Sequence, residues 1–167
     1  NGSVGTFSSA DGGVTWTATF TPSANIEDTT NMVTVGASYT DVAGNAGSGG
    51  TSTNYAIDTL APTATIVVDD TALKIGESAN ITITFSEAVS GFSNADLSVA
   101  NGMLSAVSSA DGGITWTATF TPNAPVEDAT NIITLAAGSV ADVAGNVNSG
   151  ATDSNNYAID TLAPTVS

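Results

Sequence analysis

The sequence repeats itself with a period of about a hundred residues, and this repetition constrains the fold more than any other feature. Residues 1–35 match residues 101–135 at 22 of 35 positions, and the block Thr15–Pro22 returns unchanged as Thr115–Pro122. A period of this length is the size of a whole domain and is too long for one unit of a helical or leucine-rich solenoid. The sequence therefore predicts a tandem array of separately folded domains joined by short linkers.

The repeat restarts after the segment Asp-Thr-Leu-Ala-Pro, which occurs at 58–62 and again at 160–164. We therefore expect residues 1–60 to be the C-terminal part of one repeat, 61–161 a complete repeat and 162–167 the start of a third. Residues 1–60 contain no counterpart of 63–100, so this part should leave apolar strand faces and edges open. The missing strands would come either from an adjoining part of a longer protein or from a neighbouring chain.

Strand patterns dominate the chain. Over 114–120 threonine alternates with apolar residues, and similar alternation occurs over 14–20 and 80–85, which is typical of strands with one buried face. Clusters of Gly, Asn, Asp and Pro separate the segments. Seven strands are predicted in the complete repeat, at 64–69, 79–86, 95–100, 103–109, 113–121, 129–137 and 155–160. The predicted fold class is all-β: tandem immunoglobulin-like antiparallel β-sandwiches with about seven strands per repeat.

The charge of the chain excludes several functions. Sixteen carboxylates face one basic residue, Lys74, and the net charge is −15. Such a surface repels nucleic acid and anionic lipid, so we expect neither a nucleic-acid partner nor membrane insertion in this segment. Because the chain contains no His and no Cys, the usual nucleophile–base pairs are unavailable and no enzymatic activity is expected. The acidic surface instead favours cations.

Several segments of the complete repeat carry a family resemblance. They are Phe-Ser-Glu-Ala-Val-Ser-Gly-Phe at 85–92, Asp-Gly-Gly-Ile-Thr-Trp-Thr-Ala at 111–118 and Asp-Val-Ala-Gly-Asn at 142–146. With them the chain resembles the bacterial Ig-like repeats of giant surface adhesins, including those of biofilms, over 58–164 and in part over 1–62. The resemblance implies a secreted, cell-surface, multi-repeat adhesin, often exported by a type I system and often calcium-dependent.

The topology of a seven-strand sandwich also predicts a calcium site. Three of its loops gather at the pole where the preceding domain enters. Repulsion among the carboxylates there would be relieved by a divalent cation, and calcium suits an all-oxygen ligand set. The predicted ligands from these loops and the incoming linker are Asp58, Glu87, Asp96, Asp111, Asp142 and Asn146, with Glu27 and Asp28 added from a turn of the preceding repeat. The alternative is that these residues are ordinary solvated loop residues in Asx-turns.

The predicted function is mechanical. We expect extracellular extender repeats that hold a distal binding region away from the cell, with Ca²⁺ stiffening each junction and neighbouring repeats of the same chain as partners. One alternative is a filament or matrix in which copies of the chain exchange strands. A second is a glycan-binding module, for which Trp16 and Trp116 could stack on sugars. Both tryptophans lie on the apolar face of their strands, however, so we expect them in the core.

Overall fold

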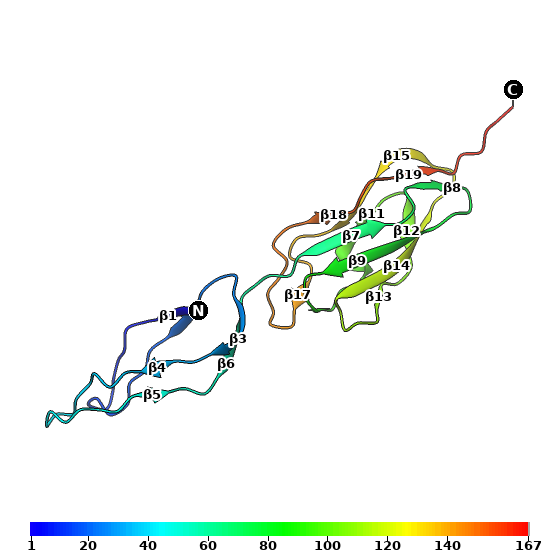
Figure 1. Cartoon of the computed structure of the whole chain (residues 1–167). Helices are drawn as coiled ribbons and strands as arrows, with labels where there is room; N and C mark the ends of the chain where they lie inside the picture. The colour runs from blue at the N-terminus through cyan, green and yellow to red at the C-terminus, as the bar shows by residue number, and fades with distance from the viewer. Residues whose placement is uncertain (167) are drawn as a thin grey trace. The chain divides into compact units, whose positions relative to one another are not determined.

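The computed structural model describes residues 1–166, and its regular secondary structure is almost entirely β-strand (Figure 1). It divides into two compact units, with the boundary between Leu60 and Ala61. We call residues 1–60 the first unit and the residues from Ala61 onward the second unit. The only helix in the described part of the chain is a single 3₁₀ turn, η1 (Asn94–Asp96). The all-β fold class is confirmed.

One layer of the second unit is an antiparallel sheet in the order β12-β14-β9-β7, with β13 also paired to β14. Threonines of β9 and β14 lie opposite each other, Thr115 with Thr84 and Thr117 with Thr82. The strands are β7 (Ala64–Val68), β9 (Ala79–Phe85), β12 (Gly102–Leu104), β13 (Ser108–Ser109) and β14 (Thr115–Pro122).

Shorter strands build the rest of the second unit. Their sheets run in the orders β15-β19-β8, β11-β16-β18 and β10-β17, and β8 is parallel to β19. The strands are β8 (Ala72–Lys74), β10 (Val89–Ser90), β11 (Leu97–Val99), β15 (Glu127–Asn131), β16 (Ile133–Leu135), β17 (Ala141–Asp142), β18 (Thr152–Asp153) and β19 (Tyr157–Asp160). Strands β8, β10, β17 and β18 were not predicted; each is two or three residues long and lies outside the longer segments that the sequence pattern indicates.

The core of the second unit lies between these layers. It includes Ile81, Ile83 and Phe120 from the long sheet and Leu135 and Tyr157 from the shorter ones. The rings of Phe120 and Tyr157 meet edge to face with centroids 5.2 Å apart. As expected, Trp116 packs against this core, while its indole N–H donates to the carbonyl oxygen of Gly113 at 3.0 Å. Apolar residues from both layers thus form one continuous core, as in a β-sandwich.

The first unit contains three two-stranded sheets, β1-β2, β3-β6 and β4-β5. Their strands repeat those of the second unit from β12 onward: β1 (Gly2–Val4), β2 (Phe20–Pro22), β3 (Glu27–Asn31), β4 (Thr34–Val35), β5 (Gly50–Thr51) and β6 (Tyr55–Asp58). Phe20 and Tyr55 keep an edge-to-face contact at 5.6 Å. The expectation that Trp16 lies in the core is wrong: 59% of its surface is exposed, because no counterpart of β9 covers it in the described residues.

Candidate metal centre

Asp142 is a buried acidic side chain at one end of the second unit. It ends β17, lies opposite Val89 of β10 and is only 3% exposed. Its Oδ1 accepts hydrogen bonds from the backbone N–H of Gly145 (2.7 Å) and Asn146 (2.8 Å), and its Oδ2 accepts one from Nδ2 of Asn146 (2.8 Å). Gly145 has a φ of +95°, a conformation that favours glycine, so the segment Asp-Val-Ala-Gly-Asn closes this turn through its own sequence.

The hydrogen bonds keep Asp142 ionised. Burial raises the pKa of its carboxyl, but the hydrogen bonds from Asn146 and the backbone of Gly145 stabilise the charged form more, so the net pKa lies below the ordinary value. A buried carboxylate with fixed orientation is thus available at neutral pH. Asn146 orients this carboxylate through both of its hydrogen bonds.

Glu87 lies beside Asp142. A carboxylate oxygen of each lies within 4.8 Å of the other, and Glu87 is half-buried. The backbone next to Glu87 is held by two hydrogen bonds between Thr63 and Ser86: Ser86 N–H donates to the Thr63 carbonyl (2.9 Å), and Thr63 N–H donates to Ser86 Oγ (3.0 Å). The sequence did not indicate this pair, because serine and threonine are common throughout the chain.

Asp58 is the last residue of β6 in the first unit and lies five residues before Thr63 in the sequence. In the first unit it stands opposite Glu27 across the β3-β6 ladder, and its Oδ1 accepts a hydrogen bond from Leu60 N–H at 3.2 Å. Asp28 is the next residue of β3, and its Oδ1 accepts from Thr30 N–H at 2.8 Å. Glu27 and Asp58 are therefore cross-strand neighbours at one end of the first unit, whereas Asp28, as the next residue of the strand, faces the opposite side of the ladder.

The carboxylates of Asp111 and Asp96 are engaged in their own loops. Oδ1 of Asp111 accepts from the backbone N–H of Thr115 (2.8 Å) and from Ser109 Oγ (2.9 Å), and these hydrogen bonds lower its pKa to about 2. Asp96 closes a capping box at η1, where its Oδ2 accepts from Ser93 N–H at 2.8 Å. Both side chains thus have a local structural role, as in the Asx-turn interpretation, and their role as metal ligands stays a prediction.

The chemistry of the donor set fits a hard divalent cation. All predicted ligands offer oxygen, and the chain has no His and no Cys that could add nitrogen or sulfur donors. Calcium takes six to eight such oxygens in flexible geometry, whereas zinc and copper sites are built around nitrogen and sulfur. Two nearby carboxylates also repel each other unless a cation or proton lies between them.

Comparison with known families agrees with the observed fold. The family model of the bacterial Ig-like domain matches residues 1–57 and 58–159. The chain belongs to the bacterial Ig-like domain family. No curated protein and no solved structure matches the sequence significantly.

Bacterial Ig-like domains are typically extracellular repeats with a structural or adhesive role, and the family is typically non-enzymatic. Within the described residues, no helix is long and apolar enough to cross a membrane. The two family matches correspond to the two copies of the internal repeat. Each unit therefore corresponds to one Ig-like match. The broad expectation of an extracellular structural or adhesive repeat is therefore supported at the level of the family.

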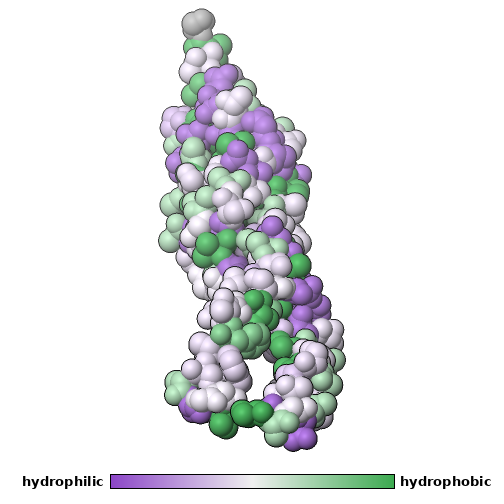
Figure 2. All heavy atoms as spheres, turned by 90° about the vertical axis from the view of Figure 1, so that its left-hand side faces the viewer, coloured by the Kyte–Doolittle hydropathy of each residue, from purple (hydrophilic) through white to green (hydrophobic). Residues whose placement is uncertain are grey.

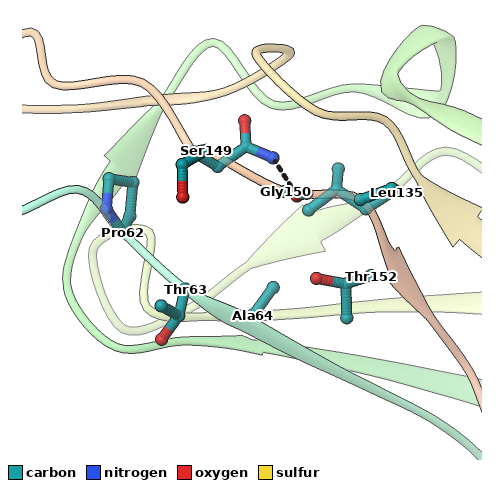
Figure 3. A pocket seen from close by; sticks show the side chains of 9 residues that line it. Pro62, Thr63, Ala64, Leu135, Ser149, Gly150 and Thr152 are labelled. Carbon is teal, nitrogen blue, oxygen red and sulfur yellow. Dashed lines mark hydrogen bonds between the residues drawn. The ribbon is translucent and has the colours of Figure 1, made fainter.

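A shallow pocket of about 180 Å³ lies on the second Ig-like unit between the start of β7 and the segment before β18 (Figure 3). Pro62, Ala64 and Leu135 form its apolar part. Thr63, Ser149 and Thr152 supply hydroxyl groups, and Asn148 Nδ2 donates to the Gly150 carbonyl at 3.1 Å beside them. None of its described lining residues is aromatic, so the pocket offers no stacking platform for a sugar ring.

Proposed function

We propose that this chain is a stretch of structural extender repeats from a large secreted bacterial surface adhesin. The repeats hold a distal binding region away from the cell, and Ca²⁺ bound at each junction between repeats stiffens the array. Membership of the bacterial Ig-like family and the domain-sized repetition support the structural role. The acidic loops supply the ligands.

The observation that carries the calcium proposal is the pair Glu87 and Asp142. Asp142 is buried, ionised and oriented by three hydrogen bonds, and a second carboxylate lies within 4.8 Å of it. Two unit charges about 4 Å apart repel by roughly 4 kcal/mol at an effective dielectric constant of 20. A divalent cation between them converts this repulsion into attraction.

Asp58 is the proposed third ligand, contributed by the linker. The hydrogen bonds between Thr63 and Ser86 fix the start of the second unit next to Glu87, and only four residues separate Thr63 from Asp58. Glu27 and Asp28 lie at the same end of the first unit, and Asp96, Asp111 and Asn146 complete the proposed set. Asp160 repeats Asp58 at the far end of the second unit, so the same arrangement is proposed for the next junction.

Thermal unfolding of the full chain tests this function. An ion that binds only the folded state raises the free energy of unfolding by RT ln(1 + [L]/Kd), which is about 0.4 to 1.4 kcal/mol when the ion is present at about one to ten times Kd. We expect a higher Tm in millimolar calcium than in chelator, and no such difference in Glu87→Gln. The matched control is Glu77→Gln, since Glu77 lies in the turn between β8 and β9 and pairs with Lys74 at 2.8 Å.

The control variant should retain the full response to calcium. If wild-type protein unfolds at the same temperature in calcium and in chelator, the junction proposal is wrong and the acidic loops are ordinary solvated surface. The alternative function is assembly into a filament by strand exchange between copies of the chain. Sedimentation of the full chain distinguishes the two: the extender sediments as a monomer, and the filament forms large assemblies that depend on protein concentration.

A further inference from the structure

The dipeptide Asn-Gly occurs twice in the chain, at 1–2 and again at 101–102. In the second unit Asn101 precedes β12 and has a φ of +57°, a conformation that asparagine adopts more readily than most residues. Gly102 begins β12, where a Cβ would overlap the ring of Phe120 and crowd the carbonyl oxygen of Thr121. Backbone conformation and packing thus both favour this dipeptide at the start of β12.

The side chain of Asn101 joins two sheets of the second unit. Its Nδ2 donates to Asp128 Oδ2 at 2.9 Å and to Asn131 Oδ1 at 2.8 Å. Both acceptors belong to β15, whereas β12 belongs to the sheet that contains β14. In the first unit Asn1 makes the corresponding two contacts with β3. One amide group therefore holds this corner of the sandwich closed.

Asparagine followed by glycine is also the dipeptide that loses its side-chain amide most readily. The glycine nitrogen attacks Cγ of the asparagine and gives up its proton, and Nδ2 leaves as ammonia while a succinimide ring closes. Water then opens the ring at either carbonyl and leaves aspartate or isoaspartate. Gly102 has no side chain to hinder this attack. The ladder bonds to β14 involve Asn101 and Ser105 through Asn123 and Thr119, so the N–H of Gly102 points away from β14.

We infer that Asn101 is a site of spontaneous deamidation, and that its contacts with β15 restrain the reaction while the second unit is folded. To bring its Cγ to the nitrogen of Gly102, the side chain must turn and break both hydrogen bonds of Nδ2. The reaction therefore proceeds from states in which this corner has opened, at a rate set by their population. The restraint depends neither on the extender function nor on calcium.

Water, which the second step consumes, is available at this corner. Asn101 is half-buried, and its carbonyl oxygen accepts a hydrogen bond from Asn123 N–H at 2.8 Å. The carbonyl oxygen of Asn123 in turn accepts from Thr161 Oγ1 at 2.8 Å, where residues 161–166 leave the second unit. Figure 2 shows hydrophilic residues gathered at this end of the second unit. Solvent therefore lies next to the reacting groups.

The product does not fit the closed corner. A carboxylate at position 101 offers only acceptors to Asp128 and to Oδ1 of Asn131, where the amide donated two hydrogen bonds. The carboxylate of Asp128 would also repel it. Isoaspartate further adds a methylene group to the main chain ahead of β12. Each event thus favours the open corner, so deamidation irreversibly marks a repeat that has opened.

Peptide mass spectrometry of the full chain tests the inference after incubation at mildly alkaline pH with and without urea. We expect Asn101 to deamidate in urea, and at least about tenfold more slowly in the folded chain. Asp128→Ala removes one acceptor and should accelerate the reaction in the folded chain. The matched control is Asp153→Ala, which should leave the rate unchanged because Asp153 accepts from Thr134 Oγ1 in another sheet.

A second measurement tests the effect of the product. Asn101→Asp should lower Tm relative to wild type, whereas Asn123→Asp adds the same charge at an exposed neighbouring position and should leave Tm unchanged. Absence of deamidation in urea, or equal rates in the folded and unfolded chain, overturns the inference. Equal Tm values of the two variants overturn the destabilising effect. If Asn101→Asp does not fold, the two rates measured on wild-type protein still decide the question.

Discussion

Asn146 binds both carboxylate oxygens of Asp142, with its backbone N–H at 2.8 Å from Oδ1 and its Nδ2 at 2.8 Å from Oδ2. Asn45 makes the same two contacts with Asp41 in the first unit, also at 2.8 Å each. The turn is therefore encoded locally by the repeated segment Asp-Val-Ala-Gly-Asn. The two copies differ in burial: Asp142 is buried and Asp41 is exposed.

This difference predicts unequal effects of the same substitution. Asp142→Ala removes a buried carboxylate that accepts three hydrogen bonds from partly exposed donors, so in the presence of chelator we expect the free energy of unfolding of the second unit to fall by about 2–3 kcal/mol. Asp41→Ala should leave that transition unchanged, because Asp41 lies in the other unit. Denaturant unfolding measures both variants. No loss of stability in Asp142→Ala would show that this buried turn does not stabilise the second unit.

A second matched pair tests whether the two units differ in their cores. Leu135→Ala empties a fully buried position and should lower the free energy of unfolding of the second unit by about 2–5 kcal/mol. Val35→Ala removes methyl groups that are already half in solvent, so its cost should stay within about 0.5 kcal/mol. Urea unfolding of the full chain provides the comparison. A large effect of Val35→Ala would mean that the first unit is packed more tightly than its exposure indicates.

Tyr157 predicts a stabilising substitution. Its side chain is fully buried, and in the described part of the chain its hydroxyl has no hydrogen-bond partner. Burial, reinforced by Asp128, raises the pKa of Tyr157 to about 12. Tyr157→Phe removes the unpaired hydroxyl and keeps the ring on Phe120, so we expect Tm to rise or stay unchanged. A fall in Tm would show that the hydroxyl has a partner, such as a buried water molecule.

Ionisation of Tyr157 should also limit stability in alkali. The unfolded chain releases the phenol proton near pH 10, whereas the folded chain keeps it until about pH 12. The contribution of this group to stability is thus present below pH 10 and is lost as pH rises towards 12. Absorbance near 295 nm should show one tyrosine that titrates only with alkaline unfolding, and this late step should be absent in Tyr157→Phe.

Asp111 predicts loss of stability in acid. Hydrogen bonds from Thr115 lower its pKa to about 2, whereas an aspartate in an unfolded chain titrates near 3.9. The unfolded state therefore binds more protons between these values, so the contribution of Asp111 is complete above pH 4 and disappears as pH falls to about 2. Between pH 5 and pH 2, the Tm of Asp111→Asn should fall less steeply than the Tm of the wild type. An unchanged slope would assign the acid sensitivity to other carboxylates.

Much of the fold could be predicted from the sequence, because β9 and β14 alternate apolar and polar residues over their whole length. The burial of Trp16 in the first unit could not be predicted from this alternation. Trp16 and Trp116 occupy identical local sequences, and only the presence of β9 decides which one is covered. Burial of this kind depends on long-range pairing, which local alternation does not contain.

The acidic residues show the same limit. The sequence indicated which loops carry carboxylates, and the structure brings Glu87 close to Asp142 within the second unit. It could not decide whether Asp111 and Asp96 close their own turns or bind a metal, because a turn-closing residue and a metal ligand can be of the same type. The Thr63–Ser86 contact was also unpredictable, since it joins two segments 23 residues apart.

Calorimetric titration of the full chain with Ca²⁺, alongside Glu87→Gln and Glu77→Gln, tests the central claim most directly. We predict saturable binding to wild type and to Glu77→Gln with a Kd of about 10⁻⁴ to 10⁻³ M, as is usual for extracellular calcium modules. Binding to Glu87→Gln should be at least tenfold weaker. If wild type binds no calcium in this range, or if Glu87→Gln binds it equally well, then Glu87 and Asp142 do not form a calcium site and the stiffening of the junction must have another cause.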